Sequence, residues 1–172
     1  AVLDCEEVAP DFHARYSCTR KEYIYKFWNS EVRNPFLDGY ALHYRYKIDE
    51  NLLDKAAQAY VGRHDFTSFC TLDNREKGDM TRNVKAFSVT REGDLVTMKV
   101  EADGFLYNMV RIMVGTLLRI QQGKIAPDEI PSIIEKKNRK YSGPTAQACG
   151  LYLNRVNYEN DNSSQKGVNA DV

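Results

Sequence analysis

One long apolar stretch with a single polar stripe constrains the fold of this chain most strongly. It begins as Gly104-Phe-Leu-Tyr-Asn-Met-Val-Arg-Ile-Met-Val-Gly115 and continues to Arg119. This pattern predicts a helix that is apolar on nearly every side. The polar residues of the stretch recur every three or four positions and so share one face: Asn108, Arg111, Gly115, Arg119 and Gln122. Such a helix needs a core around it, and 172 residues with 42% hydrophobic side chains are enough for one folded domain.

Arg111, in the middle of this stripe, is the residue most in need of a partner. A guanidinium stays charged, and burying it without an anion is strongly unfavourable. In a structural role, Arg111 would pair with a carboxylate of this chain such as Glu101 or Asp103. In a functional role, it would orient a catalytic carboxylate in a cleft and stabilise the ionised form of a nucleophile. The residues alone do not favour either role.

The remaining pattern predicts an α+β fold with a mixed, mostly antiparallel sheet flanked by helices. The expected strands are 22–29, 40–47, 82–91, 95–102 and 151–158, with a hairpin turn at 92–94. The expected helices are 49–61, 104–119 and 127–137, the first capped by Asp49 and stopped by Gly62. Residues 70–81 are expected to form a long loop.

Composition limits the possible partners and compartment. Lys plus Arg and Asp plus Glu are both 24, so a nucleic-acid partner would need a local basic patch. No apolar run approaches the roughly 18 residues of a membrane span. The four cysteines lack a CxxC pair and the three histidines lack metal-ligand spacing. We therefore expect a cytoplasmic protein with reduced thiols, no metal and no membrane contact.

A basic and aromatic run precedes the first expected strand. Its cations and rings interleave as Arg15, Tyr16, Arg20, Lys21, Tyr23 and Tyr25. Cations could contact phosphates here while a ring stacks on a base. The more economical interpretation is a solvated strand edge with core tyrosines. The run Lys136-Lys-Asn-Arg-Lys140 poses the same choice between a solvated helix end and a phosphate contact.

The segment His64-Asp-Phe-Thr-Ser-Phe69 contains the residue types of a hydrolase triad. Adjacency in sequence does not make a triad, because its members must converge in space. We favour a packed turn anchored by Phe66 and Phe69, in which Thr67 or Ser68 bonds the local backbone.

Six motifs occur together in a specific order. They are Asp11–Ser17, Lys21–Tyr25, Asp65–Phe69, Thr81–Val84, Gly104–Gly115 and Gly150–Leu153. The set closely resembles the tRNA pseudouridine synthase A (TruA) family over residues 1–158. Any one of the motifs alone would be a weak signal.

This resemblance implies a tRNA pseudouridine synthase, an isomerase that converts uridine to pseudouridine at positions 38, 39 and 40 of the tRNA anticodon arm. It further implies a cytoplasmic homodimer that uses no cofactor or metal. Residues 1–158 would be the C-terminal portion of the pseudouridine synthase domain, and 159–172 a polar, disordered tail. The alternative is a non-catalytic RNA-binding module.

The resemblance also assigns site residues by position. Tyr23 is similar to the tyrosine that stacks on the target base and is a candidate for taking the proton from carbon 5. Arg111 resembles the arginine that pairs with the catalytic aspartate, and Leu151 the apolar residue that closes the pocket. Arg15, Arg20 and Lys21 are expected phosphate contacts, although they match the family less closely.

One family motif is missing. The nucleophilic aspartate of the family lies in a Gly-Arg-Thr-Asp-x-Gly-Val type motif, which does not occur in this sequence. We therefore expect this aspartate to lie upstream of residue 1, and the 172-residue chain to be inactive alone.

Overall fold

The computed structural model describes residue 2, residues 4–71 and residues 78–158 of the chain. The helices and strands in these ranges are β1 Cys18–Trp28, β2 Leu42–His43, α1 Glu50–Ala57, β3 Gly62–Asp65, β4 Thr81–Glu92, β5 Leu95–Ala102, α2 Met109–Gln121, α3 Ile130–Glu135 and β6 Leu151–Tyr158. Short 3-10 helices lie in the connections, at Pro35–Leu37, Gln58–Tyr60, Thr67–Phe69, Arg139–Tyr141 and Ala148–Gly150. The expected tail at 159–172 and part of the expected loop at 70–81 fall outside the described residues.

The strands form one mixed sheet in the order β2-β1-β5-β4-β3, and β6 also pairs with β1. The β1–β2 pair is parallel, whereas the other pairs are antiparallel. Strand β6 covers residues 18–25 of β1, and β2 pairs farther along at Phe27 and Trp28. The predicted α+β class with a mostly antiparallel sheet is confirmed.

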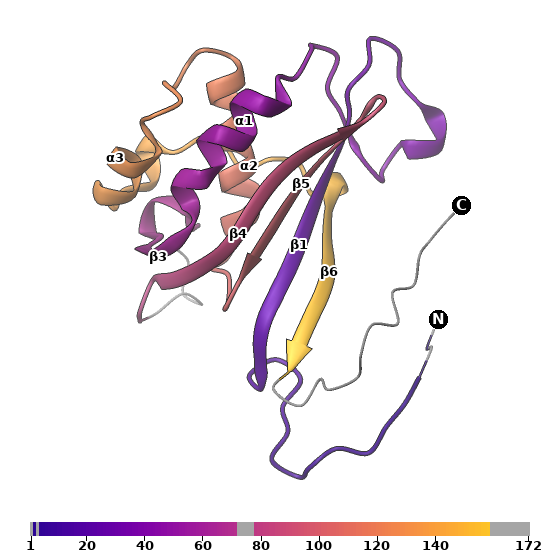
Figure 1. Ribbon diagram of the computed structural model, residues 1–172, viewed down its shortest axis with the longest axis vertical. Helices are drawn as coiled ribbons and strands as arrows, with labels where there is room; N and C mark the ends of the chain where they lie inside the picture. Colours follow the sequence, from indigo (N-terminus) through magenta and orange to yellow (C-terminus); the bar gives the residue numbers. More distant parts are fainter. Residues whose placement is uncertain (1, 3, 72–77, 159–172) are drawn as a thin grey trace.

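One face of the sheet is covered by helices and forms the core. In Figure 1 the three helices gather on one side of the sheet, near β3 and β4, while β6 lies at the far edge. Strand β5 shows the alternation, because Val96, Met98 and Val100 are buried whereas Lys99 on the other face is exposed. Each such apolar side chain stabilises the fold by about 2 kcal/mol when fully buried.

The hairpin formed by β4 and β5 is the most regular part of the fold, as the sequence predicts. Glu92 pairs with Leu95 across a two-residue turn, and Gly93 there has a φ of +57°. A left-handed residue at this point fits the twist of the flanking strands, which is why glycine suits it.

Helix α1 begins where the sequence predicts and ends earlier. The Asp49 side chain accepts a hydrogen bond from the backbone N–H of Leu52 at 3.0 Å, which satisfies one open donor of the first turn. The expected helix to residue 61 is interrupted after Ala57, where the last turn tightens into the 3-10 helix Gln58–Tyr60.

The expected strand at 40–47 is mostly wrong, since only Leu42–His43 pairs as β2. The carbonyls of Tyr44 and Tyr46 instead accept hydrogen bonds from the Asn29 side chain, each at 2.7 Å. One side-chain amide thus replaces the strand neighbour that these carbonyls would otherwise need.

The two later helices are also shorter than predicted. Helix α2 begins at Met109 rather than Gly104, because Asn108 adopts the left-handed conformation with a φ of +61°. Helix α3 covers Ile130–Glu135 of the expected 127–137, and Lys137 beyond its end also has a positive φ. The final strand, β6, has the predicted bounds. None of the helices in the described ranges combines the length and apolar character needed to cross a membrane.

Candidate functional site

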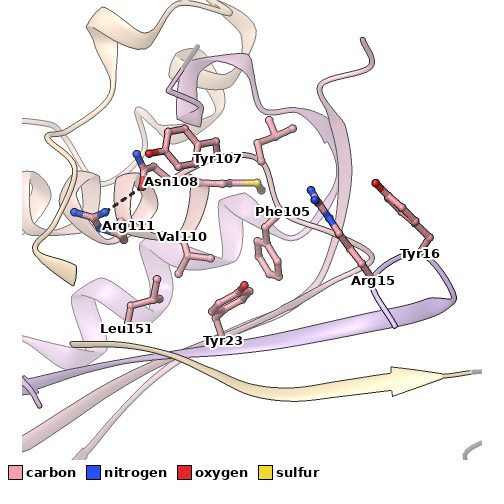
Figure 2. Close-up of a pocket in the computed structure, with 11 residues that line it drawn as sticks. Arg15, Tyr16, Tyr23, Phe105, Tyr107, Asn108, Val110, Arg111 and Leu151 are labelled. Atoms are coloured by element: carbon pink, nitrogen blue, oxygen red, sulfur yellow. Dashed lines mark hydrogen bonds between the residues drawn. The ribbon is translucent and has the colours of Figure 1, made fainter. Parts of the chain in front are cut away.

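A cavity of about 670 Å³ lies between the sheet and the entry to α2 (Figure 2). The sheet contributes one residue from β1 and one from β6. The loop before α2 and its first turn supply most of the wall, and the segment before β1 supplies the rest. The lining residues are Arg15, Tyr16, Tyr23, Phe105, Leu106, Tyr107, Asn108, Met109, Val110, Arg111 and Leu151.

Asn108 sets the geometry at the start of α2. Its left-handed backbone is a conformation that asparagine tolerates better than other residues with a side chain, apart from aspartate. Its side-chain amide donates to the Thr71 hydroxyl at 3.2 Å, and its carbonyl oxygen accepts from Arg111 Nη1 at 3.1 Å. The residue that stops the helix from extending toward Gly104 thus also orients the guanidinium.

Two hydrogen bonds join Arg111 to the backbone of Ala146, one donated by each residue. Its Nε donates to the Ala146 carbonyl at 2.7 Å, while the Ala146 N–H donates to the Arg111 carbonyl at 3.0 Å. The chain can approach α2 this closely because Gly115 has no side chain. A Cβ there would lie 1.7 Å from the Pro144 carbonyl oxygen. This contact fixes the position of Arg111 relative to the sheet.

The Arg111 guanidinium has no carboxylate partner in the described part of the chain. Its contacts there are the neutral acceptors of Ala146 and Asn108, which leaves the Nη2 donors available. The predicted structural partners are engaged elsewhere: Glu101 pairs with Arg20 at 3.1 Å, and Asp103 accepts from the Asn83 N–H at 2.9 Å. Of the two roles that the sequence left open for Arg111, pairing with Glu101 or Asp103 is therefore not the one observed.

Tyr23 forms the floor of the cavity beside Phe105. Their ring centroids are 5.1 Å apart at an interplanar angle of 87°, an edge-to-face contact. Burial raises the pKa of the Tyr23 phenol above its usual value, because the charged form would lose hydration. At neutral pH the site therefore presents a neutral hydroxyl and an aromatic face.

The expected site residues fall into two groups in Figure 2. Arg111 and Leu151 lie at one end of the cavity, Arg15 lies near Tyr16 at the other, and Tyr23 lies between them. The Arg15 guanidinium lies 5.6 Å from the centroid of the Tyr16 ring, in range of a cation–π contact. Four of the six predicted site residues thus line one cavity.

Arg20 and Lys21 are not among the residues that line this cavity. Arg20 forms the ion pair with Glu101, and Lys21 Nζ lies 3.5 Å from the Arg15 carbonyl oxygen. Alternation along β1 explains the separation. Arg20, three positions before Tyr23, points to the opposite face of the sheet. Lys21, two positions before Tyr23, shares its face but lies farther along the strand.

The hydrolase-like segment forms a packed turn, as favoured from the sequence. Phe66 and Phe69 are fully buried, whereas the three candidate triad side chains bond separately. A His64 ring nitrogen contacts the Val61 carbonyl, Asp65 accepts from Thr67, and Ser68 donates to the Ile133 carbonyl. Only the expected bond from Thr67 or Ser68 to the local backbone is wrong, because the Thr67 hydroxyl donates to the Asp65 side chain and the Ser68 hydroxyl to the distant Ile133 carbonyl. No group of three or more His, Cys, Asp or Glu able to hold a metal occurs within the described ranges.

Some of the lining residues are not predicted from the sequence as part of the site. Phe105 and Tyr107 were expected to be ordinary members of an apolar helix, and Asn108 only a member of the stripe. A recognisable signal was the asparagine before the helical run, because asparagine is common where helices begin and in the left-handed conformation.

Known proteins resemble this chain over most of its length. The family model described as tRNA pseudouridine synthase matches residues 56–159. A tRNA pseudouridine synthase A 1 from Bacillus cereus is 42% identical over 159 residues, which cover 92% of this chain and 64% of the relative. Proteins named tRNA pseudouridine synthase A from Bacillus pumilus and Moorella thermoacetica are each 44% identical, with the same two coverages.

These matches confirm the predicted resemblance. The chain spans about 64% of the length of these curated relatives. The family model covers more than half of the chain, including α2 and β6, which line the cavity. The chain therefore belongs to the tRNA pseudouridine synthase A family.

Proposed function

We propose that this chain is the C-terminal part of a tRNA pseudouridine synthase that acts on uridines 38, 39 and 40 of the anticodon arm. The observation that carries the proposal is the Arg111 guanidinium, whose open donors lie in a cavity floored by Tyr23. A fork of this kind suits a carboxylate, which it can bind through two parallel hydrogen bonds. The names of the relatives support the choice of tRNA as substrate.

The reaction rearranges atoms within one nucleoside. The bond from ribose C1′ to N1 breaks, the uracil turns, and a bond from C1′ to C5 forms. The C5 proton leaves and N1 gains a proton, so substrate and product are isomers. Because the balance needs no oxidant, reductant or group donor, we propose that the enzyme works without a cofactor.

Arg111 is proposed to orient the nucleophilic aspartate, which a segment outside this sequence would supply. The described residues that line the cavity include no carboxylate, so the 172-residue chain is proposed to be inactive alone. An arginine already fixed by Ala146 and Asn108 would lose little freedom when the aspartate arrives.

Tyr23 is proposed to stack on the target base and to accept the proton from C5. A target inside a stem must leave the base stack, and an apolar pocket compensates for the lost stacking. Phe105 and Leu151 supply that apolar wall beside Tyr23. Because burial raises the pKa of the Tyr23 phenol, the hydroxyl starts neutral, so its oxygen would accept the C5 proton while passing its own hydroxyl proton on to N1 or to solvent, after formation of the C1′–C5 bond.

We further propose that the full-length protein is a cytoplasmic homodimer. Four exposed apolar side chains, Val32, Phe36, Tyr40 and Tyr46, lie in the single segment between β1 and α1. Clustered exposed apolar side chains often mark a protein interface. Light scattering of the full-length protein would measure its mass directly, and a monomer at all concentrations would contradict this part of the proposal.

Tritium release from tRNA labelled at uridine C5 tests the enzymatic proposal. The full-length protein should release tritium from the anticodon arm, whereas residues 1–172 alone should release none. A tRNA with cytidine at positions 38, 39 and 40 is the matched control substrate. Release from residues 1–172 would contradict the missing nucleophile, and no release from the full-length protein would contradict the function.

A second candidate, a non-catalytic RNA-binding module, is favoured by the absence of a carboxylate among the cavity-lining residues that the structure describes. In that case the open Arg111 fork would bind phosphate, and Arg111→Ala would weaken RNA binding with a reduced salt dependence. The two candidates differ in the full-length protein. If Arg111→Ala abolishes turnover and leaves RNA affinity unchanged, the binding-module alternative fails.

A further inference from the structure

A second hollow, of about 450 Å³, lies near the C-terminal end of α2. Four cations line it: Arg119, Lys124, Arg139 and Lys140. We call these four residues the basic basin. Its remaining wall includes the backbone of the segment that leads from Arg139 to the close contact with Gly115. Within the described ranges, no aspartate or glutamate lines the hollow.

The charge of the basic basin is not compensated by ion pairs within the described ranges. The side-chain contacts of its arginines are to neutral groups. Arg119 Nη1 lies 3.5 Å from Gln122 Oε1, and Arg139 donates to Ser142 Oγ at 2.9 Å and to Thr145 Oγ1 at 3.3 Å. Since the whole chain carries equal numbers of acidic and basic side chains, this local excess is not a consequence of composition.

The wall of the basin is fixed by its own hydrogen bonds. Asn138 accepts from the Lys140 N–H at 3.0 Å and begins the 3-10 helix Arg139–Tyr141. Gly143 then packs on Gly115 so closely that a Cβ there would lie 2.5 Å from the Gly115 carbonyl. Burial lowers the pKa of the Arg139 guanidinium, because its charged form is partly dehydrated. An anion in the hollow would offset that loss.

The basin and the candidate active site lie along one helix. Arg111 and Arg119 belong to the same polar stripe of α2 and are eight residues apart. Eight residues of α-helix span about 12 Å. An A-form RNA duplex has a somewhat shorter rise per base pair than the roughly 3.4 Å of B-DNA, so about four stacked pairs cover the same length. An RNA hairpin is therefore long enough to reach both places at once.

We propose that the basic basin binds a backbone phosphate of the RNA whose uridine enters the cavity beside Tyr23. The identity of the RNA rests on the proposed function, while the phosphate chemistry rests on the four uncompensated cations. Phosphate contacts of this kind position a nucleic acid without reading its sequence. The basin would thus hold the RNA beside the cavity while the target base is extruded.

The test compares two double variants of the full-length protein that remove the same charge. Arg119→Gln/Lys140→Gln alters the basin, and Lys55→Gln/Lys85→Gln removes two exposed lysines outside the cavity and the basin. The dissociation constant of a synthetic anticodon-arm hairpin is measured over a range of salt concentrations. In a plot of log affinity against log salt, the basin variant should lower the magnitude of the slope by about 1. Its affinity at low salt should fall about tenfold.

Each outcome bears on the proposal. Equal slopes for the two double variants would overturn it. A basin variant that binds the hairpin normally and loses affinity only for a polyglutamate probe would also overturn it, in favour of an acidic protein partner. Arg139 is left intact because its bonds to Ser142 and Thr145 support the local fold.

Pseudouridine formation by the same preparations separates this proposal from the proposed function. An active wild-type enzyme with equal slopes for both variants would contradict only the basin. An inactive wild-type protein with a reduced slope for the basin variant would contradict only the proposed function and leave the phosphate site in place.

Discussion

Arg91 and Arg111 are two partly buried arginines with opposite surroundings. Arg91 donates from Nε to Glu50 at 2.9 Å, and from Nη2 to Asn29 Oδ1 at 2.9 Å and the Ile48 carbonyl at 2.8 Å. Its charge is thus matched by a carboxylate and its donors by nearby acceptors. Arg111 contacts only neutral acceptors among the described residues and lies in a cavity.

We propose that the difference separates an arginine that stabilises the fold from one whose charge is free to bind an anion. Bringing Arg91 out of water is offset inside the chain by Glu50. For Arg111 the Ala146 and Asn108 contacts set the direction of the guanidinium but leave its charge unmatched. An anion from outside the described residues would therefore interact with Arg111 far more strongly than with Arg91.

The substitution Arg111→Lys in the full-length protein gives the largest expected effect. Lysine keeps the charge but cannot hold a carboxylate through two parallel bonds or reproduce the Nε bond to Ala146. Tritium release per enzyme should fall by about 100-fold or more, equal to roughly 3 kcal/mol of activation free energy. The melting temperature should drop only slightly, since one neutral hydrogen bond contributes about 1 kcal/mol.

Arg63→Lys is the control for this substitution, because Arg63 is exposed on β3 and does not line the cavity. It should leave tritium release unchanged. If Arg111→Lys retained wild-type activity, Arg111 would be a structural arginine like Arg91, and the contrast between them would disappear.

The substitution Arg91→Gln should give the reverse pattern. It leaves the Glu50 carboxylate and the Ile48 carbonyl without their donor, so the free energy of unfolding should fall by about 2–3 kcal/mol. Urea denaturation measures this loss. Activity per folded molecule should stay at the wild-type level, because Arg91 lies outside the cavity. An activity loss without a stability loss would contradict the structural role.

The substitution Gly115→Ala tests whether Arg111 depends on its backbone support. A Cβ at this position would overlap the Pro144 carbonyl oxygen, so the segment that ends at Ala146 must move away from α2. Overpacking of this kind costs about 2 kcal/mol of stability. Tritium release should also fall, because Ala146 orients the guanidinium. Ala56→Gly in α1, which should cost about 1 kcal/mol of stability, is a destabilised control that should leave the activity per folded molecule intact.

Local patterns determined which parts of the fold could be predicted from the sequence. The β4–β5 hairpin and the Asp49 cap depend on residues within a few positions of each other, and both are confirmed. The strand expected at 40–47 failed because Asn29, far away in the sequence, bonds the carbonyls of that segment. Alternation of side chains does not reveal a competing side-chain amide.

The candidate site was predictable in its charges but not in its geometry. The polar stripe pointed to Arg111 and the family resemblance to Tyr23 and Leu151, and these three residues line the same cavity. The contact with Ala146 could not be predicted, because it forms between segments 35 residues apart through backbone groups that every sequence has. The left-handed conformation of Asn108, which sets the start of α2, had only a weak local signal in the sequence.

The smallest predicted effect is the pH dependence of the fold stability that the ion pair between Glu50 and Arg91 produces. The hydrogen bond from Arg91 is the main reason that the pKa of the Glu50 carboxyl is lowered from its usual 4.5. A lowered pKa stabilises the fold above 4.5, and this contribution is lost as the pH falls through the value in the folded state. Glu50→Gln should therefore cost about 1 kcal/mol at neutral pH and nothing in strong acid. Urea denaturation across this pH range checks it, with Glu135→Gln as an exposed control without an ion pair among the described residues. A constant difference between wild type and Glu50→Gln at all pH values would show that the pair stabilises the fold through packing rather than through charge.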